Sequence, residues 1–136
     1  MKAPPLEKYK NQITFILKND EHVLFAYLFG SSITGIITPM SDIDIGVYLM
    51  RNSDNTRCRF NLIGKLIETL KTDAIDLVIL NTAPLTLTAR IIRNKELLVD
   101  KSSSIRHSFE SLVLRQYYDF SLKENHLLGR RFSFAR

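Results

Sequence analysis

The stretch YLFGSSITGIITPMSDIDIGVY, from Tyr27 to Tyr48, decides how the rest of the chain is interpreted. An apolar segment ends on Gly30 and Ser31, a polar turn follows, and a second apolar segment carries Asp42 and Asp44. Ten residues separate Ser31 from Asp42. The stretch predicts two strands, with a glycine–serine bend at the end of the first and two acids on the second.

The two acids predict a metal site. Residues two apart in a strand point to the same face, so we expect Asp42 and Asp44 to project together while Ile43 and Ile45 face the core. Two adjacent carboxylates repel each other unless a cation lies between them. Mg²⁺ prefers oxygen ligands and is usually held by one or two carboxylates together with substrate phosphates.

The bend before these acids suits an anion. Gly30 lets the backbone approach a ligand closely, and Ser31 offers a hydroxyl and an N–H at an expected helix N-terminus, where anions bind well. Each half has an ordinary structural explanation, since Asp-x-Asp can mark a solvated strand edge and Gly-Ser a simple turn. Together, at this spacing, they favour a nucleoside triphosphate bound through Mg²⁺.

A third acid interrupts an apolar segment further along the chain. Residues 75–80, IDLVIL, predict a strand that carries Asp76. Burying an unpaired carboxylate is costly, so this acid is either a structural group with hydrogen-bond partners or a third metal ligand. The nearby acid pair favours the third ligand.

The residues Gly30, Ser31, Asp42 and Asp44 match the G-S-x10-D-x-D signature, and the chain resembles the DNA polymerase beta-like nucleotidyltransferases. Its length makes it similar to the minimal nucleotidyltransferases (MNT, MntA-type antitoxins), which are encoded beside HEPN-domain proteins. The resemblance covers nearly the whole chain and implies an α+β (α/β-like) fold, with a small mixed β-sheet flanked by helices and a C-terminal helix. The family often has arginine where Thr34 stands, and threonine cannot supply that charge to a triphosphate.

The resemblance also implies an activity, the Mg²⁺-dependent transfer of AMP from ATP to a tyrosine hydroxyl of a HEPN toxin, which silences the toxin. Asp42, Asp44 and Asp76 would hold two Mg²⁺ ions, with Asp76 as the general base. Gly30 and Ser31 would hold the β- and γ-phosphates.

Two other functions remain open. The chain could be a non-catalytic antitoxin that neutralises its partner by occlusion. It could also be a small-molecule adenylyltransferase of the antibiotic-modifying type, although those usually carry an extra helical domain that 136 residues hardly allow. A nucleic-acid substrate is not favoured, because no appended RNA-binding module is present.

The composition predicts one soluble cytoplasmic domain, residues 1–136. It is 45% hydrophobic and 24% charged, and no segment approaches the roughly 20 apolar residues of a membrane span. A single cysteine, Cys58, excludes an internal disulfide and suits a reducing compartment. Arg57 and Arg59 could mildly activate this thiol, but an incidental surface or helix-facing thiol is favoured. The three histidines lack the spacing of a zinc site.

Hydrophobic periodicity predicts the remaining elements. We expect helices over residues 6–18, 57–70, 84–94 and 102–122, a short helix or turn over 31–37, and strands over 22–29, 43–50, 75–80 and 96–99.

The C-terminal third predicts a surface for a partner. From Arg90 onward there are ten Lys and Arg against five acids, which accounts for the net charge of +5. One face of helix 102–122 is mostly apolar: Ile105, Phe109, Leu112, Val113, Gln116, Tyr117 and Phe120. Arg106, Glu110 and Arg115 are expected on the opposite face. Core packing of the stripe and a solvated basic surface are the alternatives to docking. Helix 102–122 and the basic tail 123–136 form the expected docking segment, and the terminal RRFSFAR, residues 130–136, is expected to be ordered only when bound. The sequence is compatible with a homo- or hetero-oligomer.

Overall fold

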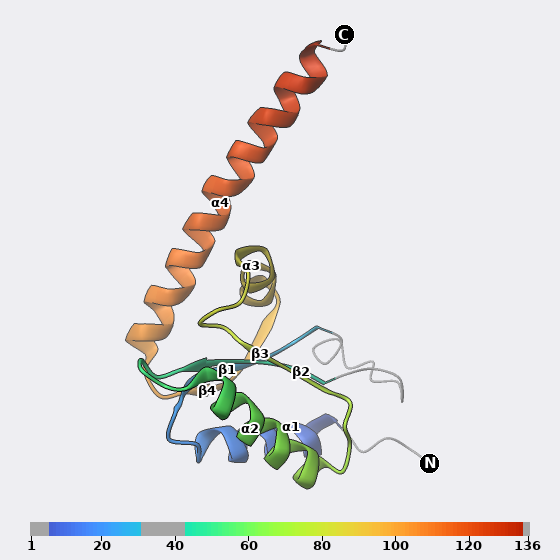
Figure 1. Cartoon of the computed structure of the whole chain (residues 1–136), viewed down its shortest axis with the longest axis vertical. Helices are drawn as coiled ribbons and strands as arrows, with labels where there is room; N and C mark the ends of the chain where they lie inside the picture. Colours follow the sequence, from blue (N-terminus) through green and yellow to red (C-terminus); the bar gives the residue numbers. More distant parts are fainter. Residues whose placement is uncertain (1–5, 31–42, 135–136) are drawn as a thin grey trace.

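The structure, a computed structural model, describes the backbone of residues 6–30 and 43–134 and the side chains of 9–30 and 43–125. Helices and strands alternate irregularly along the chain (Figure 1). In order, the elements are α1 (Leu6–Lys18), β1 (Val23–Phe29), β2 (Ile43–Leu49), α2 (Asn55–Leu70), β3 (Ile75–Ile79), α3 (Leu85–Arg93), β4 (Lys95–Asp100) and α4 (Ser103–Phe134).

The four strands form one mixed sheet in the order β3-β2-β1-β4. β1 is antiparallel to both β2 and β4, whereas β2 and β3 are parallel. A parallel pair needs a long crossover connection, and α2 supplies it. The predicted α+β fold with a small mixed sheet is confirmed, and every strand lies where the apolar segments placed it, within about two residues.

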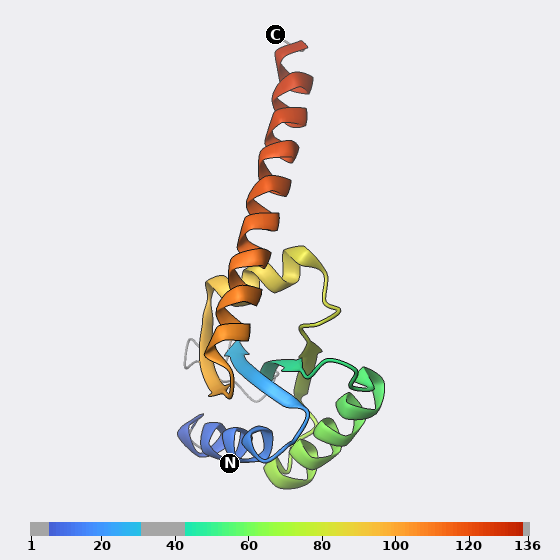
Figure 2. The same ribbon diagram turned by 90° about the vertical axis from the view of Figure 1, so that its left-hand side faces the viewer.

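Helices cover both faces of the sheet (Figures 1 and 2). On one face, α1 and α2 pack against alternate residues of β2, including Ile43, Ile45 and Val47. On the other face, α3 and the first turns of α4 pack against Phe25 and Tyr27 of β1. Because side chains alternate along a strand, the intervening residues of β2 face the layer formed by α3 and α4. Asp44, which lies between Ile43 and Ile45, therefore belongs to the face that α3 and α4 only partly cover.

Cys58 lies in the core and is only 6% exposed. It belongs to the cluster that α2 forms with the sheet. Burial raises the pKa of this thiol, and the charges of Asp20 and Asp54 act in the same direction. Of the two expected placements, a surface or a helix-facing thiol, the structure thus shows a buried thiol that faces the other helix, α1, and the expectation of mild activation by the neighbouring arginines was wrong.

The C-terminal helix is longer than the sequence suggested. α4 spans 32 residues, from Ser103 to Phe134, and extends far past the sheet (Figure 1). The predicted end at Leu122 was wrong, because the next twelve residues contain no proline and several good helix formers. None of the helices in the described part of the chain combines the length and hydropathy that a membrane-spanning helix needs.

A polar network attaches the start of α4 to the sheet. The Tyr27 hydroxyl donates to Glu110 Oε1 at 2.6 Å, and Lys95 Nζ lies 3.1 Å from the same oxygen. Arg106 bridges Glu110 at 3.2 Å and Asp100 at 3.0 Å. Arg106 and Glu110 had been expected on the outer face, so that prediction was wrong: they face β1 and β4.

The network shifts the pKa of its members in opposite directions. Burial, reinforced by the hydrogen bond to Glu110, raises the pKa of Tyr27 far above its usual value. Burial alone would raise the pKa of Glu110 and of Asp100. In Glu110, hydrogen bonds from Tyr27 and Lys95 outweigh burial and lower the pKa; in Asp100, those from Ser103 and Arg106 do so. Burial would lower the pKa of Arg106, but its hydrogen bonds to Asp100 and Glu110 raise it.

Candidate active site

Two of the predicted metal ligands lie side by side. In the parallel pairing of β2 with β3, Asp44 is the register partner of Asp76. Neighbouring strands are about 4.8 Å apart, and register partners project from the same face of a sheet. Ile43 and Ile45, on either side of Asp44, point into the core as predicted. The sheet topology thus places two acids that are distant in sequence next to each other.

Asp76 is exposed, whereas its neighbour Leu77 is buried. An exposed carboxylate keeps its hydration and does not incur the cost of burial. The cost of burial, which made this acid stand out in the sequence, does not apply to it. An acid in this position is accessible to a ligand from solvent.

Gly30 lies against one side of the carboxylate pair. Its φ angle is +68°, in the left-handed region that favours glycine. A Cβ atom built on Gly30 would lie 2.2 Å from Asp44 Oδ2, far inside van der Waals contact. Only a residue without a side chain lets the end of β1 approach this carboxylate so closely. Gly30, the first residue of the predicted bend, thus lies directly against Asp44.

These three residues line a pocket of about 390 Å³. Leu87 and Arg90 of α3 and Asn94, which directly follows this helix, also line it, and the remaining lining residues are Phe29 and Val78. Two carboxylates, one guanidinium and one carboxamide therefore face the same space. This set can hold a cation at the carboxylates and an anion near the arginine.

The structure brings together three of the five predicted site residues, Gly30, Asp44 and Asp76. Ser31 and Asp42 lie outside the described residues, as does the segment 31–37 expected to form a helix or turn. Within residues 9–30 and 43–125, no group of three His, Cys, Asp or Glu side chains is arranged to hold a metal ion. The described part of the site therefore supplies two of the three acids that the sequence predicts.

Arg90 and Asn94 were missed as site residues. In the sequence, Arg90 stood out only as part of the basic C-terminal third. The two residues are four apart in the predicted helix 84–94, a spacing that would place their side chains on the same side of that helix, although α3 itself ends at Arg93. That spacing was a readable signal, but it did not reveal that this side of α3 faces the acids.

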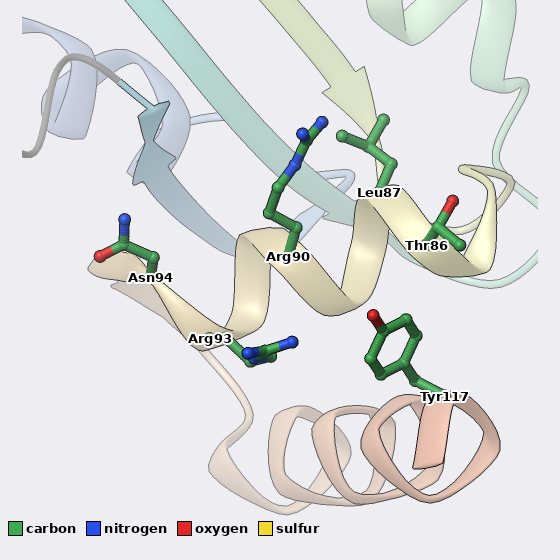
Figure 3. Close-up of a pocket in the computed structure, with 6 residues that line it drawn as sticks. All are labelled: Thr86, Leu87, Arg90, Arg93, Asn94 and Tyr117. Atoms are coloured by element: carbon green, nitrogen blue, oxygen red, sulfur yellow. The ribbon is translucent and has the colours of Figure 1, made fainter. Parts of the chain in front are cut away.

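A second pocket lies between α3 and α4 (Figure 3). It measures about 570 Å³ and shares Leu87, Arg90 and Asn94 with the first pocket. Arg93 and Tyr117 line only this second pocket, where the guanidinium of Arg93 lies 5.8 Å from the centre of the Tyr117 ring. Arg90 instead extends from α3 away from Tyr117, toward the strands (Figure 3).

Comparisons with known proteins agree with this geometry. A family described as polymerase beta, nucleotidyltransferase matches residues 11–104. A crystal structure of a toxin–antitoxin with AMP-PNP is 27% identical, with a TM-score of 0.73, over 89% of this chain and 96% of that one. A tri-AMPylated Shewanella oneidensis HEPN toxin in complex with MNT antitoxin gives 25% identity and a TM-score of 0.69, over 92% and 97% of the chains.

A third similar structure, the toxin–antitoxin MntA-HepT, is 25% identical with a TM-score of 0.68, over 91% of this chain and 97% of that one. Among curated proteins, no sequence match was found. The resemblance to MNT proteins noted from the sequence is confirmed.

Proposed function

The chain belongs to the polymerase beta nucleotidyltransferase family, and we propose that it is an MNT-type antitoxin that transfers AMP from ATP to a tyrosine hydroxyl of a HEPN toxin. The observation that carries the proposal is the register pairing of Asp44 with Asp76 beside Gly30, in a pocket open to solvent. The similar structures support the choice of partner and nucleotide, since one contains AMP-PNP and another an AMPylated HEPN toxin.

The acids of this pocket fit Mg²⁺. Carboxylate oxygens are the ligands that hard divalent cations prefer, and both acids line the same pocket as Gly30. Asp44 and Asp76 would hold the metal together with Asp42, whose part in the site rests on the sequence. Two bound ions would polarise the α-phosphate and neutralise charge on the leaving pyrophosphate.

The protein groups have separate tasks in the transfer. The tyrosine oxygen attacks the α-phosphorus, and the bond from that phosphorus to the oxygen of the β-phosphate breaks as pyrophosphate leaves. Asp76, the more exposed acid, accepts the proton from the tyrosine hydroxyl. Backbone N–H groups at Gly30 and Ser31 hold the β- and γ-phosphates in line with the attack.

The partner docks on α4, which continues the single domain 1–136. Val113 is buried in the apolar cluster that α4 forms with β1 and α3, and Phe109 and Tyr117 are partly buried there. Other large apolar side chains of α4 are exposed: Ile105, Leu112, Leu114, Tyr118, Phe120 and Leu122. Exposed apolar side chains along a helix that projects past its own sheet are typical of an interaction surface.

Mass spectrometry tests the transfer. Incubation of the chain with the HEPN protein encoded beside it and Mg²⁺-ATP should increase the mass of that protein by one or more adenylate units. The matched variant Asp44→Asn should bind the partner and leave its mass unchanged. An unchanged partner mass with the wild-type chain, in a stable complex that still silences the toxin, would favour occlusion instead.

A further inference from the structure

We propose that Arg90 binds the β- and γ-phosphates of the nucleotide and is the principal protein cation of the triphosphate site. The inference rests on the proposed function, because it assumes a nucleoside triphosphate in the pocket of Asp44 and Asp76. It assigns a phosphate-binding role to a side chain that lies outside the glycine–serine bend and outside the acidic strands.

The sequence shows why another cation is needed. The segment from Asn19 to Met50, which contains the bend and two of the acids, has no lysine or arginine. Backbone N–H groups at the bend can donate hydrogen bonds that stabilise part of the negative charge of a triphosphate. The carboxylates of the neighbouring acids repel the remaining negative charge of the triphosphate. Beside bound Mg²⁺, any full positive charge that the protein itself supplies to the triphosphate must therefore come from an element outside this segment.

The pocket supplies that charge from α3. Among the described residues that line it, Arg90 is the one with a cationic side chain. Gly30 and Asp44 lie in the same pocket, at the end of β1 and on β2. Arg90 projects from α3 toward the strands (Figure 3), and it lines the same pocket as the two acids.

Arg90 is available for an anion. Its side chain is exposed, and within residues 9–30 and 43–125 it takes part in no ion pair. Arg106, in contrast, is committed to Asp100 and Glu110. A guanidinium can donate two parallel hydrogen bonds to phosphate oxygens, which suits it to this role better than lysine.

Arg93 provides a matched control. It lies one turn after Arg90 on the same helix, is also exposed and has the same charge. It contacts the ring of Tyr117 and lines only the second pocket. Substitution of either residue by glutamine removes one positive charge from α3, so a general effect of charge would appear in both variants.

The test is calorimetric titration of the full chain, without partner, with Mg²⁺-AMP-PNP and with AMP. Arg90→Gln should weaken AMP-PNP binding roughly tenfold or more, the effect of losing a charge-assisted contact, and leave AMP binding unchanged. Arg93→Gln should bind both nucleotides like the wild type. Arg90→Lys should recover part of the lost AMP-PNP affinity, because the charge returns without the paired donors.

Equal AMP-PNP affinity in Arg90→Gln and the wild type would overturn the inference, as would equal losses for AMP-PNP and AMP. An Arg90→Gln variant that changes only the KM for the HEPN partner would overturn it too, since the side chain would then serve the acceptor. The outcome is separate from that of the proposed function. Metal-dependent nucleotide binding that needs Arg90 could be observed even if no AMP reached the partner.

Discussion

Asp44 on β2 and Asp76 on β3 are register partners in the parallel pair at one edge of the sheet. The crossover through α2 brings them together, although 31 residues separate them in the sequence. Since neighbouring strands are about 4.8 Å apart, both carboxylates can contact one cation or two adjacent ones. Replacing either acid, or adding a side chain to Gly30 beside Asp44, should reduce activity.

Asp76→Asn should abolish transfer without destabilising the fold. Asparagine keeps the size of the side chain but removes the negative charge and the ability to accept the proton of the acceptor hydroxyl. We expect the rate of AMP transfer to fall at least roughly hundredfold, and the free energy of unfolding to change by less than about 0.5 kcal/mol because the side chain is exposed. Single-turnover kinetics and urea unfolding measure the two effects. A variant of normal rate would remove Asp76 from the site.

Gly30→Ala should damage the site through the backbone. The new Cβ would lie 2.2 Å from Asp44 Oδ2, and alanine is strained at a φ of +68°. We expect a loss of more than about 1 kcal/mol in unfolding free energy and, because Asp44 must move, a fall of roughly hundredfold in transfer rate. Urea unfolding and transfer assays check both.

Gly64→Ala is the control for this substitution. Gly64 lies within α2, and a Cβ there meets no atom within 4 Å. Alanine favours a helix interior, so this variant should gain about 0.5–1 kcal/mol in stability and keep full activity. If the two glycine variants behaved alike, the close approach of Gly30 to Asp44 would have no functional meaning.

The network around Glu110 should make stability fall in acid. In the folded state the pKa of Glu110 lies below its ordinary value of 4.5. The carboxylate therefore stabilises the fold above that value, and this contribution is lost as the pH falls from 4.5 through the lowered pKa of the folded state. Glu110→Gln should cost about 1.5–3 kcal/mol near neutral pH and weaken the dependence on acid.

Urea unfolding at a series of pH values measures this contribution. Glu124→Gln, an exposed change further along α4, is the matched control and should alter stability by less than about 0.5 kcal/mol. An acid limb that is equally steep in wild type and Glu110→Gln would show that other carboxyl groups govern the loss of stability.

The exposed apolar residues of α4 should govern affinity for the partner. Phe120 is 42% exposed on α4, and Phe60 is 71% exposed on α2, which covers the other face of the sheet. Phe120→Ser should weaken binding of the HEPN protein about tenfold or more, as expected for an interface aromatic. Phe60→Ser should bind normally. Calorimetry or surface plasmon resonance distinguishes them, and equal affinities would place the interface elsewhere.

Much of the fold was predictable because its signals are local. Apolar segments bounded by polar turns marked each strand, and the alternation around Asp44 placed Ile43 and Ile45 in the core. The pairing of Asp44 with Asp76 was expected from the resemblance and from the unusual acid in an apolar strand. These predictions depend on periodicities that a chain carries in its sequence.

The missed features depend on tertiary placement. Arg90 became a site residue because α3 packs across the face that carries the acids, which helical spacing alone does not reveal. Glu110 looked like an outer-face residue, yet hydrogen bonds from Tyr27 and Lys95 compensate its burial against the sheet. The predicted end of α4 at Leu122 was wrong because the residues that follow it favour a helix.

Transfer of label from ATP to the HEPN partner tests the central claim most directly. The chain and its partner are incubated with Mg²⁺ and with ATP labelled either at the α-phosphate or at the γ-phosphate. The account predicts that α-label becomes covalently attached to a partner tyrosine, that γ-label does not, and that Asp44→Asn attaches neither. Absence of α-label from a partner that binds the wild-type chain, or attachment of γ-label, would contradict it.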